Sequence, residues 1–266
     1  MNKINVSCFQ TNSSQYPDKN IYMLEKMFNS IQQKNVELVC LPECVAVFSE
    51  SLTRINLFFD QWKNKFLDLL ACHARRMNSH ILIGSIPYKK KNGKFFNRSL
   101  LIGKDGKVLC HYDKINLFDV DLDNNEKYME STNYDPGKHS KTISLPWGVL
   151  GFSICYDLRF PKLYKKLASD GATCFSIPAA FTFTTGKYHW HTLLKSRAIE
   201  NGCYVFAPAQ FGFHDNGRRT FGHSMIIDPW GKVLKEADKK NSVITAKINL
   251  DLVDTVRKKI PSMNIY

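Results

Sequence analysis

Residues 148–161 read Gly-Val-Leu-Gly-Phe-Ser-Ile-Cys-Tyr-Asp-Leu-Arg-Phe-Pro, and this stretch decides how the rest of the chain is interpreted. The apolar run predicts a strand, the polar residues a sharp turn, and Pro161 the first turn of a helix. Cys155 therefore stands at the end of a strand and close to a helix N-terminus, where free N–H groups favour a thiolate. A buried structural cysteine is the alternative, and this stretch alone leaves both open.

The composition is typical of a globular protein, and we expect a single domain over residues 1–266. No apolar run approaches the roughly 18 residues of a membrane span. The N-terminus enters an alternating strand pattern at once, so we expect no signal peptide. Eight cysteines without an export signal indicate reduced thiols and a cytoplasmic protein.

The net charge of +13 raises the question of an acidic partner, because basic proteins often bind nucleic acid or anionic membranes. The lysines are scattered in short runs without interleaved aromatic residues, as at Lys89–Lys91 and Lys239–Lys240. This pattern is typical of a solvated surface. We therefore expect no nucleic-acid or membrane partner, and a positive field that suits a small anionic substrate.

The apolar patterns alternate between strands and helices, with hairpins inserted. Strands are predicted over residues 3–10, 36–41, 80–87, 95–102, 107–111, 140–145, 149–154, 173–177, 204–208, 222–228, 233–236 and 243–248. Helices are predicted over 20–33, 62–77 and 188–200, with a short one after Pro161 and a polar loop over 115–137. This alternation predicts an α/β fold with a mixed sheet system covered by helices.

Three ionisable residues follow predicted strands, namely Glu43, Lys114 and Cys155. In open α/β sheets, functional groups gather at the carboxyl ends of the strands. A carboxylate can take the proton of a thiol, and an ammonium can stabilise the thiolate and then an oxyanion. Glu43 and Lys114 are each more typical of a surface position when taken singly, but together with Cys155 they make a complete set for hydrolysis.

Histidine is the competing base, because a Cys–His pair is the commoner arrangement in cysteine hydrolases. His189 and His191 lie at the start of a predicted helix and His223 begins a predicted strand, and their spacing selects none of them. No metal site is indicated, because Cys40 and Cys44 have no second pair at ligand spacing.

Three motifs carry a resemblance to the nitrilase, or carbon–nitrogen hydrolase, superfamily. They are Leu41-Pro42-Glu43, Tyr112-Asp113-Lys114 and residues 154–161, in this order along the chain. Residues 197–201 and 228–231 match the superfamily as well. The resemblance implies a four-layer αββα sandwich and a homodimer.

The resemblance also implies a role for each residue. Cys155 would be the nucleophile, Glu43 the general base, and Lys114 the cation that stabilises the oxyanion together with the backbone N–H of Tyr156. A second, supporting glutamate follows the lysine in this superfamily, and Glu130 matches it better than Glu126 does. Hydrolysis by this set needs no metal and no organic cofactor.

Within the superfamily, the second half of the chain is similar to the deaminated-glutathione amidases, at residues 178–182, 185–190, 209–214 and 222–225. The implied reaction is hydrolysis of the terminal amide of a 2-oxo acid amide, which releases ammonia or an amine. The implied substrate contacts are Tyr156, Arg159, Phe181, Thr185 and His189, and Lys187 is a further candidate to bind a carboxylate.

Three alternatives remain open. The neighbouring branch of ω-amidases acts on 2-oxoglutaramate and 2-oxosuccinamate, and a true nitrilase would act on nitriles instead. A catalytically silent interaction protein could keep the same fold without the activity.

Overall fold

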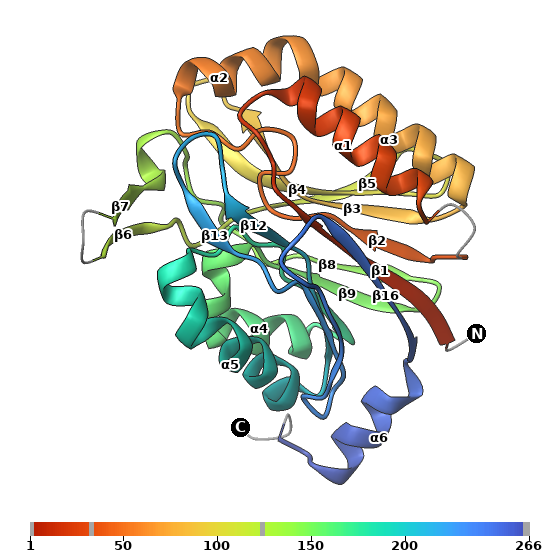
Figure 1. Cartoon of the computed structure of the whole chain (residues 1–266). Helices are drawn as coiled ribbons and strands as arrows, with labels where there is room; N and C mark the ends of the chain where they lie inside the picture. The colour runs from red at the N-terminus through yellow and green to blue at the C-terminus, as the bar shows by residue number, and fades with distance from the viewer. Residues whose placement is uncertain (1–2, 32–34, 123–125, 263–266) are drawn as a thin grey trace.

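Two mixed β-sheets face each other and helices cover their outer faces, which gives the four-layer αββα sandwich that the sequence resemblance implied (Figure 1). The computed structural model describes residues 3–31, 35–122 and 126–262. The helices and helical turns are α1 (Pro17–Asn29), α2 (Leu52–Leu57), the π-helical η1 (Phe58–Trp62), α3 (Lys63–Met77), the 3₁₀ turns η2 (Glu130–Thr132) and η3 (Cys155–Arg159), α4 (Pro161–Ser169), α5 (Phe183–Asn201) and α6 (Asp251–Lys259).

The strands form two large sheets and one separate hairpin. The first sheet has the order β13 (Arg219–Phe221), β12 (Ala209–Phe213), β1 (Lys3–Thr11), β2 (Leu38–Cys40), β3 (His80–Lys89), β4 (Phe95–Ile102), β5 (Val108–Asp113), and β16 (Ser242–Asn249) also pairs with β1. The second has the order β15 (Val233–Glu236), β14 (Met225–Ile227), β11 (Tyr204–Ala207), β10 (Cys174–Ser176), β9 (Gly148–Phe152), β8 (Thr142–Leu145). The hairpin is β6 (Asp119–Leu122) and β7 (Glu126–Met129).

Alternate residues of the central strands serve the two faces of the first sheet. Leu38 and Cys40 of β2 point into the core between the sheets, whereas Val39 and Leu41 pack with the helices on the outer face. Each face therefore has its own apolar core, because successive side chains of a strand point to opposite sides. Figure 1 shows α1 and α3 over the first sheet and α4 and α5 over the second.

Parallel pairing at the centre of each sheet brings strand ends to a common edge. β1, β2 and β3 run parallel, and so do β9, β10 and β11. Because the two sheets face each other, loops from both meet above the shared core. This edge is where β2, β5 and β9 deliver the residues singled out in the sequence.

A close approach of backbone fixes the loop that follows β2. Gly84 of β3 lies under this loop, and a Cβ atom there would stand 2.1 Å from the carbonyl oxygen of Leu41. That distance is far below any normal contact, so the position requires glycine. The approach seats Pro42, and with it Glu43, directly against the sheet.

The structure departs from the sequence expectations mainly in short polar elements. The predicted loop over 115–137 contains β6, β7 and η2, whose residues are at most half-buried and so carry little apolar pattern. The elements α2, η1, β12, β13 and α6 were not expected. Helix α5 begins at Phe183, five residues before the predicted start, so His189 and His191 lie within the helix.

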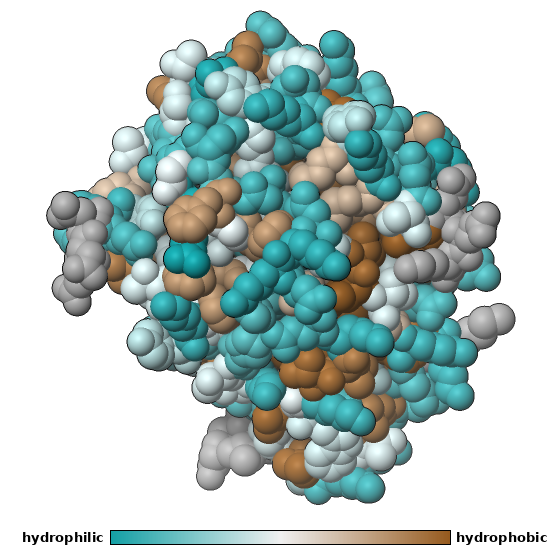
Figure 2. Space-filling view, viewed as in Figure 1, coloured by the Kyte–Doolittle hydropathy of each residue, from teal (hydrophilic) through white to brown (hydrophobic). Residues whose placement is uncertain are grey.

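Smaller differences concern helix α1 and the surface. Helix α1 begins at Pro17, because proline suits the first helical position, and it ends at Asn29, while 32–34 lie outside the described residues. The face drawn in Figure 2 is mostly hydrophilic, with hydrophobic residues in separate patches. Among the described helices, none combines the length and the apolar character that a membrane crossing requires.

Candidate active site

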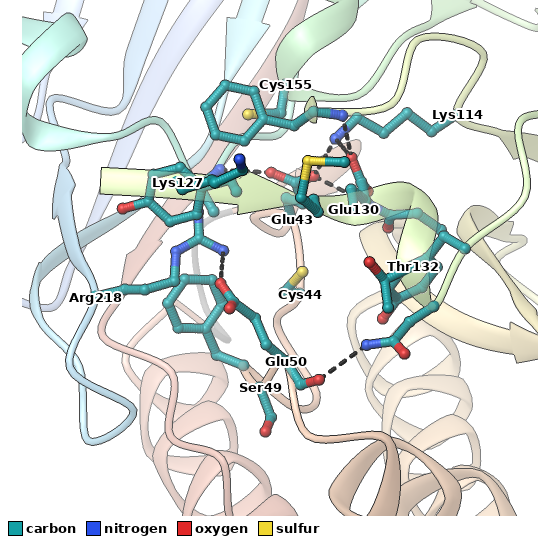
Figure 3. Close-up of a pocket in the computed structure, with 18 residues that line it drawn as sticks. Glu43, Cys44, Ser49, Glu50, Lys114, Lys127, Glu130, Thr132, Cys155 and Arg218 are labelled. Carbon is teal, nitrogen blue, oxygen red and sulfur yellow. Dashed lines mark hydrogen bonds and ion pairs between the residues drawn. The ribbon is translucent and has the colours of Figure 1, made fainter. Parts of the chain in front are cut away.

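Glu43, Lys114 and Cys155 meet in one buried cavity, although they come from three different strand ends (Figure 3). The Lys114 Nζ atom lies 3.0 Å from Glu43 Oε1, and Cys155 lines the same cavity, close enough for the Glu43 carboxylate to act on the pKa of its thiol. All three residues are at most 7% exposed. The structure thus assembles the carboxylate, ammonium and thiol that the sequence placed after separate strands.

Glu130 is the second carboxylate of this cluster. Its Oε2 accepts a hydrogen bond from Lys114 Nζ at 2.8 Å and another from the backbone N–H of Phe118 at 2.7 Å. Asn97 Nδ2 donates to Glu130 Oε1 at 2.8 Å and to Glu43 Oε1 at 3.0 Å. Glu126, the other candidate, does not line the cavity. The lysine is therefore held between two carboxylates, and Asn97 fixes the spacing of the two.

Backbone and amide groups hold Glu43 from the other side. Its Oε2 accepts a hydrogen bond from the N–H of Ala180 at 2.8 Å, and its carbonyl oxygen accepts one from Gln210 Nε2 at 2.9 Å. Ala180 follows β10 of the second sheet and Gln210 belongs to β12 of the first. The orientation of the carboxylate thus depends on both sheets.

The electrostatics of the cluster differ from the sequence expectation at the thiol. Burial, followed by the negative charge of Glu43, raises the pKa of Cys155 well above its ordinary value, although Lys114 opposes this rise. The position was expected to favour a thiolate through a helix N-terminus, but the helical turn that begins at Cys155 is the short 3₁₀ turn η3, and α4 begins only at Pro161. The N–H of Cys155 itself is donated to the carbonyl oxygen of Pro178. At neutral pH the resting thiol is therefore protonated.

The two partners of the thiol are ionised at neutral pH. Burial alone would raise the pKa of Glu43, but the charge of Lys114 and the hydrogen bonds to the carboxylate outweigh it, so the pKa is lowered. Burial likewise opposes the charge of Lys114, but Glu130 and Glu43 raise its pKa well above the ordinary value. A carboxylate base thus stands ready beside a protonated thiol.

Two residues of the cavity have backbone conformations that L-amino acids rarely adopt. Cys155 has a φ of +46° and Cys44, next to Glu43, has a φ of +54°. Such strain of non-glycine residues persists only where the surroundings enforce it, and it is common at active sites. At Cys44, part of the enforcement is the hydrogen bond from its N–H to the hydroxyl of Ser85.

Asp157 ties the turn after Cys155 to the segment that carries Lys114. Its fully buried carboxylate accepts hydrogen bonds from the Tyr112 hydroxyl (2.7 Å), from Asn116 (2.8 and 3.0 Å) and from the N–H of Ile154 (2.9 Å). Burial raises the pKa of Asp157, and these donors oppose that rise. The Tyr-Asp-Lys and Cys-Tyr-Asp motifs of the sequence are therefore halves of one structural unit.

The motifs at residues 197–201 and 228–231 each form hydrogen bonds that hold a turn in place. Arg197 of α5 donates two hydrogen bonds to the carbonyl oxygen of Leu158, at 2.9 and 3.1 Å, and so fixes the end of the turn after Cys155. Asp228 Oδ1 accepts hydrogen bonds from the N–H groups of Trp230 and Lys232 and closes the β14–β15 turn.

The cavity has a volume of about 280 Å³, and most of its wall was not foreseen from the sequence. Its lining residues are Glu43, Cys44, Phe48, Ser49, Glu50, Asn97, Lys114, Phe118, Lys127, Tyr128, Met129, Glu130, Thr132, Asn133, Tyr134, Cys155, Ala180 and Arg218. Many come from the β6–β7 hairpin and the segment after it, in the stretch expected to be a loop. Arg218 comes from the β12–β13 turn, which carried no pattern in the sequence.

The expected substrate contacts lie elsewhere. Tyr156, Arg159, Phe181, Thr185 and His189 are absent from the cavity lining, and so is Lys187. The Arg159 guanidinium lies 5.0 Å from the centre of the Phe181 ring and 3.1 Å from His189 Nδ1, so these three residues form a cluster of their own. Their contact with a substrate therefore stays a prediction, and this cavity does not include them.

The competing histidine bases do not line the cavity either. His189 pairs with Arg159, and burial followed by the charge of Arg159 lowers its pKa. His191 Nε2 and His223 Nδ1 both lie within 3.0 Å of Glu236 Oε1. The described residues therefore provide Glu43, and no histidine, as the base beside Cys155.

His191, His223 and Glu236 are the group whose ligand atoms converge closely enough to hold a metal ion in the described part of the chain. The sequence analysis did not foresee it, because the residues come from α5, from the segment before β14 and from β15. The cluster lies outside the catalytic cavity. Cys40 and Cys44 are not members of this group.

Comparison with known proteins finds relatives along almost the whole chain. Residues 5–258 match the family model described as carbon–nitrogen hydrolase. A protein named deaminated glutathione amidase from Synechocystis is 40% identical over 255 residues, which cover 92% of this chain and 91% of that protein. A protein of the same name from Dictyostelium discoideum is 36% identical over 274 residues, with coverage of 99% and 94%. An ω-amidase of Saccharomyces cerevisiae is 33% identical over 271 residues, with coverage of 97% and 91%.

Solved structures give the same result for the fold. The NitFhit protein of Caenorhabditis elegans superposes with a TM-score of 0.92 at 33% identity, and the match covers 100% of this chain and 65% of that one. Nit3 of Saccharomyces cerevisiae, described as a member of branch 10 of the nitrilase superfamily, gives a TM-score of 0.85 at 30% identity, with coverage of 98% and 95%.

Removal of the Lys114 charge is expected to destabilise the protein most at neutral pH. In Lys114→Met, Glu43 and Glu130 stay buried without their counter-ion, at a cost of about 3–5 kcal/mol. Their folded-state pKa values then exceed the unfolded ones, so the cost is complete at neutral pH and shrinks as the pH falls through the carboxyl range. Denaturant unfolding of the wild type and Lys114→Met at about pH 7 and about pH 5 measures the difference in their free energies of unfolding, which should be smaller at the lower pH.

In the wild type, the contribution of Glu43 to stability depends on pH in the opposite sense. The pKa of its Glu43 is lowered, so the stabilising contribution of that carboxylate is present at neutral pH and is lost only as the pH falls through the folded value. Lys107→Met is the matched control, because the Lys107 side chain is 83% exposed. If the free energy of unfolding of Lys114→Met differed from that of the wild type by the same amount at both pH values, the pairing of Lys114 with Glu43 and Glu130 would be contradicted.

Proposed function

The chain belongs to the carbon–nitrogen hydrolase family, and we propose that it is a cysteine-dependent amidase whose single domain acts on the terminal amide of a 2-oxo acid. The observation that carries the proposal is the buried cluster of Glu43, Lys114 and Cys155 in one cavity. A general base, a nucleophile and a cation within hydrogen-bonding reach make up the set that acyl transfer requires.

The first half of the reaction forms a thioester. Glu43 takes the proton of the thiol while Cys155 Sγ attacks the amide carbon, and the carbonyl oxygen becomes an oxyanion. Lys114 has three N–H donors, and two of them bond to Glu43 and Glu130. The third is available to the oxyanion among the described residues, and the backbone N–H of Tyr156 is the second donor that we propose.

Collapse of this intermediate breaks the carbon–nitrogen bond. Glu43 returns its proton to the leaving nitrogen, which departs as ammonia or an amine. Glu43 then takes a proton from a water molecule, whose oxygen attacks the thioester carbon. The carbon–sulfur bond then breaks and Glu43 returns its proton to the sulfur, so the products are a carboxylic acid and the free thiol, and water is the only co-reactant.

Glu130 and Asn97 act as positioning residues in this mechanism. Glu130 balances the charge of Lys114 while Glu43 is protonated, so the lysine keeps a carboxylate partner through the whole cycle. Asn97 donates to both carboxylates and limits their movement when the proton moves. Neither residue needs to touch the reacting atoms.

We propose deaminated glutathione as the substrate, with 2-oxoglutaramate or 2-oxosuccinamate as the alternative. Relatives named deaminated glutathione amidase are 35–40% identical to this chain, and relatives named ω-amidase are 31–33% identical. Both reactions release a 2-oxo dicarboxylic acid. A cavity that holds cations at its wall suits such anionic amides.

We further propose that the protein works as a homodimer in the cytoplasm. Helix α5 exposes Tyr188 (77%) and Ile199 (52%), and Trp230 (44%) lies in the turn that packs against Ile199. Such large exposed side chains on neighbouring elements are typical of an interface. All eight cysteines are free, as is usual for proteins of a reducing compartment. A tagged chain found in an oxidising compartment would contradict the location.

Substitution of the base should abolish turnover. Glu43→Gln is expected to lower kcat at least about 10³-fold, because the protonated thiol then lacks a base. Its residual activity should rise with pH, because the raised pKa of Cys155 leaves a thiolate only in alkaline solution. Steady-state kinetics across pH measures both effects. Glu126→Gln, outside the cavity, is the control, and equal losses in the two variants would exclude Glu43 as the base.

Release of 2-oxoglutarate identifies the substrate. The wild type is expected to release it faster from deaminated glutathione than from 2-oxoglutaramate, and Cys155→Ala should release none from either. A reversed order would favour the ω-amidase alternative. No release from any 2-oxo amide or nitrile, with the protein folded, would favour the silent interaction protein.

A charge on α5 should separate the subunits. Ile199→Arg is expected to shift the dimer to a monomer in sedimentation equilibrium, because a desolvated arginine on each subunit has no partner there. Val108→Arg is the control, since Val108 is 50% exposed on β5 of the other sheet. A wild type that sediments as a monomer would rule the dimer out.

A further inference from the structure

The charges that line the cavity are distributed unevenly between its two ends. The cations of the lining are Lys114, Lys127 and Arg218, and its acids are Glu43, Glu50 and Glu130. Lys114 is already paired with Glu43 and Glu130, so the reacting end has an excess of negative charge. A carboxylate of a bound substrate is repelled at that end and needs a cation elsewhere.

Arg218 provides that cation. Figure 3 draws it at the end of the cavity away from Cys155, beside Glu50. Its side chain is 20% exposed, and its guanidinium lies 4.6 Å from the centre of the Tyr128 ring and 5.0 Å from that of Phe48. The two rings pack beside the guanidinium, whose planar fork suits a planar, bidentate partner.

One edge of this guanidinium has an unused donor. Arg218 Nε is buried and has no hydrogen-bond partner among the described residues. Buried donors are nearly always bonded in native proteins, so an unpartnered one needs an explanation. Nε and a neighbouring Nη together match the two oxygens of a carboxylate, so a ligand carboxylate that displaces the atoms covering Nε satisfies both donors.

The protein's own partner for Arg218 is weak. Arg218 Nη1 lies 3.4 Å from Glu50 Oε1, and the Glu50 side chain is 62% exposed. Exposed pairs of this kind contribute little to stability. Glu50 thus forms only a weak ion pair with Arg218 and leaves some of its N–H donors unbonded. An incoming carboxylate can therefore replace Glu50.

The site around Arg218 is fixed by contacts between distant segments. Asn216, in the same turn, donates to the carbonyl oxygen of Phe48 at 3.1 Å, and Asn133 donates to that of Glu50 at 2.8 Å. Lys127 stands at the cavity wall as a second cation, and its ion pair with Asp121 is exposed to solvent, with the two side chains 62% and 72% exposed. The subsite is therefore formed before any ligand arrives.

We propose that Arg218, assisted by Lys127, binds a substrate carboxylate remote from the amide that is cleaved, and so selects anionic amides. The proposal rests on the amidase function above. The carboxylate can belong to the acyl part of the substrate or to its amine part, and the chemistry of recognition is the same for both.

Affinity for the two products tests the subsite independently of turnover. Isothermal titration of the wild type and Arg218→Gln with 2-oxoglutarate and with cysteinylglycine is expected to show a roughly 10- to 100-fold loss for one of them. Loss for 2-oxoglutarate assigns Arg218 to the acyl part, and loss for cysteinylglycine assigns it to the amine part. If Arg218→Gln lost affinity for neither product, or if the wild type bound neither product, the proposed carboxylate subsite would be wrong, whether or not the protein hydrolyses amides.

Kinetics on deaminated glutathione and on neutral pentanamide tests selectivity. Arg218→Gln should raise KM for the anionic amide about 10- to 100-fold, with a smaller change in kcat, because Arg218 does not touch the reacting atoms. Arg218→Lys should give a KM for the anionic amide between those of the wild type and Arg218→Gln, since lysine keeps the positive charge but cannot bind a carboxylate through two parallel N–H groups. Glu50→Gln should lower KM, because it removes the competing carboxylate.

The matched control is Arg219→Gln, since Arg219 packs on Phe183 and Phe213 outside the cavity. An equal effect of Arg218→Gln on the anionic and the neutral amide would overturn the role in selection. If the wild type hydrolyses neither amide, the amidase function fails, whereas the titrations still decide the carboxylate subsite.

Discussion

A single buried ammonium between two carboxylates is the constraint on which the rest of this structure depends. Lys114 is almost fully buried, and charges in such a place are tolerated only when they are paired and hydrogen-bonded. The pairing needs Glu43 from the end of β2 and Glu130 from η2, while Asn97 of β4 bonds to both. Any change that separates these elements leaves a buried charge without its partner. The stability of the fold and the geometry of the catalytic cluster therefore depend on the same contacts.

The two sheets divide the work of holding this cluster. The first sheet provides the base and the cation at its strand ends, and the second provides Cys155 and the Ala180 N–H that orients the base. Because the core between the sheets is continuous, the nucleophile and its base are positioned across the central interface of the sandwich. This explains why the thiol is buried, and hence why its pKa is raised and it depends on Glu43 for deprotonation.

Strand patterns predicted the α/β class and placed Glu43, Lys114 and Cys155 at strand ends, because these are local signals. The four-layer sandwich and the roles of the three residues followed from the resemblance to the superfamily. Glu130 and Glu126 could be ranked by resemblance, but their contacts depend on the β6–β7 hairpin, whose polar residues looked like a loop. Arg218 could not be predicted, since its position follows from a turn that packs against a segment some 170 residues earlier in the chain. The raised pKa of Cys155 was equally out of reach, because burial is a property of the assembled sheets.

The contacts of Asp157 have a mechanical consequence. One carboxylate bonds to the backbone before Cys155 and to residues on both sides of Lys114, so the two loops share an anchor. When either loop shifts, the other is drawn along with it, and the separation between sulfur and ammonium changes less than the position of either. The relative alignment of the sulfur and the ammonium therefore depends on Asp157, a residue that need not contact either of them or the substrate.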